Sequence, residues 1–140
     1  MLDNPATITI DDVTYEMHVA RIEDTTLGDG DRGIMIAWLH LNFGGSGQSA
    51  GGHVLDERED DDFGNYTRRG TAYGLDYIMQ ILHTVGADNW ENVKGRTIYV
   101  LKKDRYGSID GIANLYDPET KNIVFAKHSK EFFERWPNGR

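Results

Sequence analysis

The sequence predicts a single-domain α+β protein built mainly from antiparallel strands. Its 140 residues suffice for one domain with its own core, and the absence of cysteine rules out disulfides and thiolate metal sites. Several segments alternate apolar and polar residues with a period of two, whereas one long segment, about residues 71–85, has the period of a helix. The short connections leave little room for parallel crossovers, so we expect antiparallel pairing.

The first third of the chain predicts two long strands in a hairpin. Residues 7–10 alternate weakly, Asp11-Asp12 makes a tight turn, and residues 13–23 alternate clearly. Residues 25–33 (TTLGDGDRG) are dense in turn formers and predict a turn. Residues 33–43 are apolar at both odd and even positions, which is typical of a central strand covered on both faces. We expect them to pair with residues 13–23.

One main helix is predicted over residues 71–85. Thr71 can cap its start, and Gly86 can end it in a left-handed conformation. A short helical turn follows, with Asp88 as N-cap and Glu91 three residues later. The apolar side chains of the main helix form one stripe, made of Ala72, Leu75, Ile78, Met79, Leu82 and Val85.

Three strands and a short helix complete the predicted order. Residues 97–102, 111–116 and 122–126 predict the strands, the last two joined by a turn at 117–119. Residues 129–136 predict a short C-terminal helix that Pro137 stops. A five-stranded Greek-key barrel of the OB type also has its helix after its third strand, so an OB-like barrel is compatible with this order.

The most unusual segment joins a glycine-rich stretch to an acidic cluster. Five of the nine residues 44–52 are glycine, and six of the seven residues 56–62 are acidic. Ordering glycines costs entropy and the acids cannot be buried together, so we expect a mobile loop beside a solvated surface. This predicts a surface that binds a protein partner, comprising Gly44, Gly45, Ser46, Gly47, Gln48, Asp56, Glu57, Glu59, Asp60, Asp61 and Asp62.

The alternative prediction is a single-stranded nucleic-acid-binding protein with an OB-like fold. Basic residues and tyrosines gather around the strand at 97–102 and just before the main helix, and such a mixture suits a groove that binds single strands. The residues are Arg68, Arg69, Lys94, Arg96, Tyr99, Lys102, Lys103, Arg105 and Tyr106.

The charge is unevenly distributed along the chain. The net charge is −8, with a balance of −12 over residues 1–93 and +4 over residues 94–140. The acidic first part favours a basic partner, and the overall charge opposes nucleic acid at long range. A local basic patch can still act at short range, because salt screens beyond about 10 Å.

No motif predicts catalysis, a metal site or a cofactor. The glycine-rich stretch ends in Gly52-His53 where a phosphate-binding loop needs Lys-Ser or Lys-Thr. His53 with Asp56 is the best acid–base pair and has no nucleophile beside it, so a metal-assisted hydrolase using His53 and the acidic cluster is only a third alternative. The sequence has no membrane-length apolar run and no signal-peptide core, which favours a cytoplasmic protein.

Four segments resemble small uncharacterised proteins encoded by bacteriophages, especially those of actinobacteria. They are residues 22–28 (IEDTTLG), 42–48 (NFGGSGQ), 70–74 (GTAYG) and 90–97 (WENVKGRT). The resemblance implies a phage source and carries no assigned chemistry. With it, the sequence predicts a non-catalytic accessory protein that binds and occludes a host or defence macromolecule in the host cytoplasm, and a phage assembly component is a further alternative.

Overall fold

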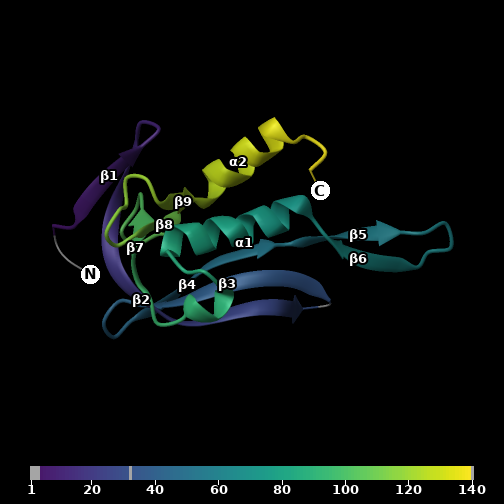
Figure 1. The fold of residues 1–140 in the computed structure, drawn as a ribbon, viewed down its shortest axis with the longest axis horizontal. Coiled ribbons are helices and arrows are strands. Elements are labelled where there is room, and N and C mark those ends of the chain that lie inside the picture. The colour runs from purple at the N-terminus through teal and green to yellow at the C-terminus, as the bar shows by residue number, and fades with distance from the viewer. Residues whose placement is uncertain (1–3, 32, 140) are drawn as a thin grey trace.

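The computed structural model describes residues 4–31 and 33–139. The protein is α+β, with a mostly antiparallel sheet, one main helix and a shorter C-terminal helix, as the sequence predicted (Figure 1). The elements are β1 (Ala6–Ile10), β2 (Val13–Asp31), β3 (Ile34–Asn42), β4 (Gly47–Val54), β5 (Asp56–Asp60), β6 (Tyr66–Gly70), α1 (Ala72–Val85), a 3₁₀ turn η1 (Trp90–Asn92), β7 (Thr97–Lys102), β8 (Gly111–Asn114), β9 (Asn122–Val124) and α2 (Phe125–Arg135).

The long strand β2 organises the main sheet, whose order is β4-β3-β2-β7-β8-β9 with β1 also on β2. Residues 13–17 of β2 pair with β1, residues 16–21 pair with β7, and residues 21–31 pair with β3. Each of these ladders is antiparallel. The predicted hairpin between residues 13–23 and 33–43 was wrong in its register, because residues 34–40 pair with residues 24–31, and only Arg21 and Ile22 of the predicted first strand pair with β3. No pairing between β4 and β8 closes the sheet into a barrel within the described residues.

Residues 25–31 are strand rather than the predicted turn. They continue β2 and pair with the first half of β3, after a register shift between Ile22 and Asp24. The turn formers in this segment are outweighed by cross-strand pairing with the apolar residues of β3, since strand stability depends on such neighbours more than on local propensity.

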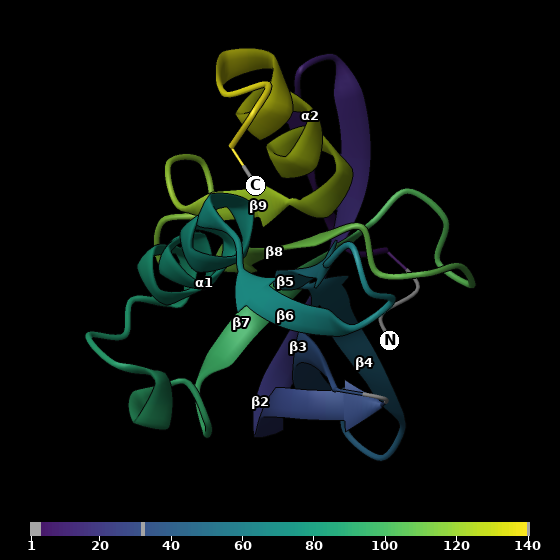
Figure 2. The same cartoon turned by 90° about the vertical axis from the view of Figure 1, so that its right-hand side faces the viewer.

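The glycine-rich and acidic stretch is also more regular than predicted. Residues 47–54 form β4 on the edge of β3, and only residues 43–46 make the connecting turn. Residues 56–60 pair with residues 66–70 in a separate two-stranded sheet, called here the ribbon (β5–β6). The ribbon projects from the body of the molecule in Figure 1 and points toward the viewer in Figure 2.

Helix α1 begins and ends where the sequence predicted. The Thr71 side chain accepts a hydrogen bond from the Gly74 backbone N–H at 2.9 Å, and Gly86 is left-handed with φ 82°. The predicted buried stripe was wrong in part, because Leu75 and Met79 are 65% and 56% exposed. The helix instead buries the face that carries its two tyrosines; its buried residues are Tyr73, Gly74, Tyr77, Ile81, Thr84 and Val85.

The remaining elements differ from prediction mainly at their ends. Asn89, not Asp88, caps the 3₁₀ turn, since its side chain accepts from the Asn92 N–H. Helix α2 starts at Phe125, four residues earlier than predicted, directly after the short strand β9. No helix in the described chain is long and apolar enough to cross a membrane.

The main core lies between the curved sheet and α1. Its fully buried members include Ile22, Val93, Val100 and Ile112, each 0% exposed. A second, smaller cluster lies on the other face of the sheet, where β1 covers Leu101 and Ala113. The face of β3 and β4 away from the core therefore stays available for contacts.

Candidate nucleic-acid interface

One face of the sheet formed by β2, β3 and β4 is aromatic and polar and is only half-buried. Along β3, Ala37, Leu39 and Leu41 are buried in the core, whereas the alternate residues are half-buried. The prediction that this strand is covered on both sides was wrong. Large apolar residues such as Trp38 reach partial burial by packing on neighbours within the sheet, so they do not require a covering layer.

A row of hydrogen bonds crosses this face from β2 to β4. His40 Nε2 lies 2.8 Å from Thr26 Oγ1, and His40 Nδ1 lies 2.9 Å from Ser49 Oγ. A neutral imidazole has one N–H and one acceptor nitrogen, so one hydroxyl accepts while the other donates. The row fixes the plane of the His40 ring beside Trp38.

Trp38 lies against the backbone of β4, where only glycine fits. A Cβ atom on Gly52 would lie 2.2 Å from the Trp38 ring, and Gly52 has φ 75°. A register shift between Ala37 and Trp38 accompanies Gly51, which has φ 100°. The glycines thus form a bulge that seats the ring, which replaces the predicted mobile loop.

A groove of about 420 Å³ runs beside this ring. Its lining comes from Trp38, from β4 and from residues 108–110 and 125–126, and it includes Ala50, Ile109 and Phe125 of the main core. The groove lies along β4, which is an edge strand because β3 is its one partner in the described part of the chain. A flexible chain can therefore enter this space from solvent.

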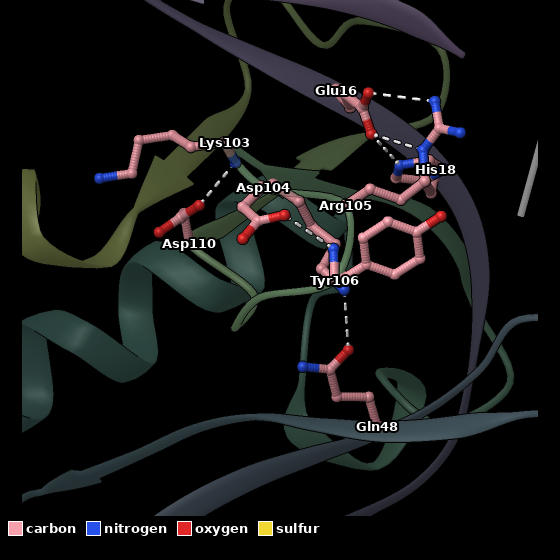
Figure 3. A network of polar contacts seen from close by, with 9 residues as sticks. Glu16, His18, Gln48, Lys103, Asp104, Arg105, Tyr106 and Asp110 are labelled. Carbon is pink, nitrogen blue, oxygen red and sulfur yellow. Dashed lines mark hydrogen bonds and ion pairs between the residues drawn. The ribbon is translucent and has the colours of Figure 1, made fainter. Parts of the chain in front are cut away.

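Residues 108–110, which line the groove, end a loop of residues 103–110 that polar contacts hold in place (Figure 3). The Lys103 N–H donates to Asp110 Oδ2 at 2.8 Å, and the Tyr106 N–H donates to Asp104 Oδ1 at 3.0 Å. Gln48 Nε2 reaches the Gly107 carbonyl at 3.4 Å and ties the loop to β4. These bonds hold the backbone while Tyr106 is 88% exposed.

Charged side chains beneath the loop neutralise one another. Arg105 and His18 both contact Glu16, at distances of 3.2 and 3.0 Å (Figure 3). The hydrogen bond from Arg105, and to a smaller extent the one from His18, holds the pKa of Glu16 below its usual value. Lys102 is 3% exposed, and its Nζ donates to Gln48 Oε1 at 3.1 Å. Lys102 lies on the same side of β7 as the buried residues Ile98 and Val100, so it does not face a ligand as predicted.

The predicted basic residues are brought together only in part. Lys103, Arg105 and Tyr106 lie in one loop, and Tyr99 packs against the small cluster under β1. Lys94 pairs with Asp24 at 3.7 Å, and Arg96 donates to the Asn92 carbonyl at 3.0 Å. Arg68 and Arg69 lie on the ribbon and bind its acids, apart from this face.

The predicted acidic surface is a ribbon whose charges are largely paired across its two strands. Arg68 binds Asp56 through two bonds, of 2.8 and 2.9 Å, and this contact lowers the pKa of Asp56. Arg69 bridges Glu57 and Glu59. The ribbon, residues 56–70, keeps a net charge of −3, which is concentrated toward its tip.

The tip of the ribbon presents a residue that the sequence analysis did not select. Asp61 Oδ1 accepts from the Phe63 and Asn65 N–H groups at 2.8 and 2.9 Å, which orders the turn and lowers the pKa of Asp61. Phe63 is 89% exposed there, beside Asp62. The sequence did contain a signal for this exposed ring: Phe63 stands between an acidic run and a glycine, and neither neighbour can cover its ring.

The described residues hold no group of three or more histidine or acidic side chains placed to bind a metal ion. Among the described residues, no hydrogen bond or ion pair joins His53 to Asp56, although both line one shallow pocket. The His53 ring lies 4.9 and 5.4 Å from those of Tyr77 and Phe125, and burial, with a smaller effect of His128, lowers its pKa.

No family model matches this chain, and neither the curated proteins nor the solved structures include a significant match to it.

Proposed function

We propose that this protein binds single-stranded nucleic acid across the face of β2, β3 and β4, without catalysis. The observation that carries the proposal is Trp38, seated on Gly52 beside the row Thr26–His40–Ser49 and next to a groove. A base can stack on an aromatic ring whatever its identity, and each such contact contributes about 1–3 kcal/mol to binding.

The strand order supports the same face. Within the main sheet, β4-β3-β2-β7-β8 with α1 between β4 and β7 is the order of an OB-type sheet. In that architecture, the face of the second and third strands and the loops around it bind oligonucleotides. These positions correspond to β3, β4 and the loop at 103–110 here, and this support is an analogy of fold.

The charges predict weak dependence on salt for a nucleic-acid binder. Lys103 is the exposed cation of the loop, and Lys94 and Arg105 are engaged by Asp24 and Glu16. Few phosphate contacts release few counterions, each contributing a slope of about −0.7 for single strands. Stacking and hydrogen bonding would then supply most of the affinity.

Replacing Trp38 with alanine is expected to weaken binding of a labelled oligo-dT about tenfold or more, because one stacking contact is lost. Fluorescence anisotropy at low salt measures this change. Trp136→Ala is the matched control, since Trp136 is 53% exposed at the end of α2 and lies outside the proposed face. Absence of binding by the native protein, or equal affinities of the two variants, would refute the proposal.

A second candidate function is binding of a basic protein partner, such as a host or defence factor, by the ribbon. The exposed Phe63, next to Asp62, favours it, because aromatic residues in the centre of an interface contribute much of its binding energy. Asp60, whose carboxylate pairs with Arg58 at 2.7 Å, adds negative charge near the same tip. Such a protein would act in the host cytoplasm by occluding the partner's basic site.

Neutralising Asp60 and Asp62 together as asparagines is expected to reduce capture of a basic partner from host lysate at low salt, because charge steers its approach. Asp61 is left in place, since it orders the tip. Asp117→Asn, in a distant turn, serves as the control. Equal recovery of the same partner by the native protein and the double variant would exclude this mechanism.

A further inference from the structure

The ribbon ends in an apolar side chain held on an ordered turn. Phe63 is 89% exposed, and the two hydrogen bonds to Asp61 fix the backbone on both sides of Asp62. An exposed phenyl ring on a fixed turn loses little conformational entropy when it enters a pocket. The ribbon tip is therefore suited to act as a plug.

The same chain carries an apolar cleft of about 560 Å³ between α1 and the end of α2. Leu75, Met79 and Trp136 line it and are 65%, 56% and 53% exposed. Its outer wall is ordered, because the Tyr73 N–H donates to the Gly139 carbonyl at 3.2 Å and the Gly139 N–H donates to the Trp136 carbonyl at 2.9 Å. The cleft can therefore receive an aromatic ring without first being formed.

The plug cannot reach the cleft of its own chain. Helix α1 starts at the root of the ribbon (Figure 1). Its first residue, Ala72, lines the cleft and follows the end of the ribbon at Gly70 by two residues, so the cleft lies at this root. Five residues of strand extend about 17 Å, which separates the tip from the root. A second copy turned by a two-fold axis, with its ribbon antiparallel to the first, would bring each tip to the root of the other.

Charges at the two ends match. Asp62 adjoins Phe63 at the tip, and the guanidinium of Arg135 lies 5.4 Å from the ring centroid of Trp136, which lines the cleft. Asp76 also lines the cleft, and its carboxylate is paired with His128 at 2.7 Å. Neither Asp62 nor Arg135 has an ion-pair partner among the described residues. A tip entering the cleft would place the carboxylate near this cation, which favours the docked orientation over others.

We infer that the protein forms a two-fold dimer in which Phe63 of each copy occupies the cleft between α1 and α2 of the other. In this closed arrangement each of the two clefts holds the Phe63 ring of the other copy, so no binding surface remains for a third copy. The inference is independent of nucleic-acid binding, because the face that carries Trp38 takes no part in it.

Sedimentation equilibrium of the full chain tests this association. The native protein is expected to be a dimer, and Phe63→Ser is expected to weaken dimerisation about thirtyfold or more, since truncating a central aromatic has effects of this size. Met79→Asp should do the same from the cleft side. Tyr116→Ser is the control, because Tyr116 is 91% exposed in a turn away from both features.

Mixing the two weakened variants sharpens the test. The Phe63→Ser copy keeps an intact cleft and the Met79→Asp copy keeps an intact plug, so native mass spectrometry should detect their heterodimer above either homodimer. A native protein that stays monomeric at every soluble concentration would overturn the inference and leave the ribbon to a foreign partner. A dimer that survives both substitutions would overturn it equally. In either case oligo-dT binding by Trp38 is measured separately and is unaffected.

Discussion

The variant Gly74→Ala is expected to be markedly less stable than the native protein. A Cβ atom on Gly74 would lie 2.3 Å from the Leu55 carbonyl oxygen and 2.7 Å from its Cα. Overpacking against a fixed neighbour costs about 3 kcal/mol, and the better helix propensity of alanine offsets only about 1 kcal/mol of that. Since small domains unfold with about 5–15 kcal/mol, a large part of the stability is lost.

Leu55 cannot move aside, because it is bonded on both sides. Its N–H donates to the Met35 carbonyl at 2.8 Å, and its own carbonyl accepts from the N–H and the hydroxyl of Thr71, each at 3.1 Å. The same residue therefore joins β3 to the start of α1. Relief of the clash would require loss of the helix cap or of the connection to the sheet.

Urea unfolding followed by circular dichroism measures this effect through the midpoint of the transition. Gly70→Ala is the matched control, because a Cβ there would meet no atom within 4 Å. That variant should be as stable as the native protein or slightly more so, since alanine restricts the unfolded chain. If both variants unfold at the same urea concentration, α1 does not rest on Leu55 as described.

The parts of the fold that local sequence determines were predictable. Thr71 and Gly86 bound α1 because a capping hydroxyl and a left-handed glycine act within one turn of the helix. The Asp11-Asp12 turn was likewise predicted, and both of its residues have positive φ. These signals need no partner elsewhere in the chain.

The ribbon was not predictable from its acidic run alone. Its strands are joined by contacts such as Arg68 with Asp56, which lie 12 residues apart and across two segments that each lack strand character. Pairing of opposite charges across strands stabilises what local propensity disfavours. The acids therefore form a strand in a hairpin, where the sequence predicted only a solvated surface.

The candidate site was missed for a similar reason. Trp38 looked like a buried residue of a central strand, and the glycines at 51 and 52 looked like a mobile loop. Each is explained by the other once β4 pairs with β3, since the ring needs a neighbour without a side chain. Only the register of that pair, with its shift at Trp38, places them together.

This dependence leads to the second large effect. The variant Gly52→Ala is expected to displace the Trp38 ring and lose both stability and affinity for oligo-dT. Two costs combine: the left-handed backbone at φ 75° disfavours alanine by about 1–2 kcal/mol, and the clash with the ring adds about 1–3 kcal/mol. The indole is rigid, so the ring can escape only by leaving its seat.

Gly44→Ala separates the two costs. Gly44 has φ 83°, close to that of Gly52, but a Cβ on it meets no atom within 4 Å. It should therefore lose only the backbone contribution and bind oligo-dT normally. Equal stability of the two variants would show that Trp38 does not rest on Gly52. A third outcome is that Gly52→Ala is the less stable of the two variants yet binds oligo-dT as tightly as Gly44→Ala. The Trp38 ring would then be seated as described, but bases would not stack on it, because displacing a ring that stacks with bases must weaken binding.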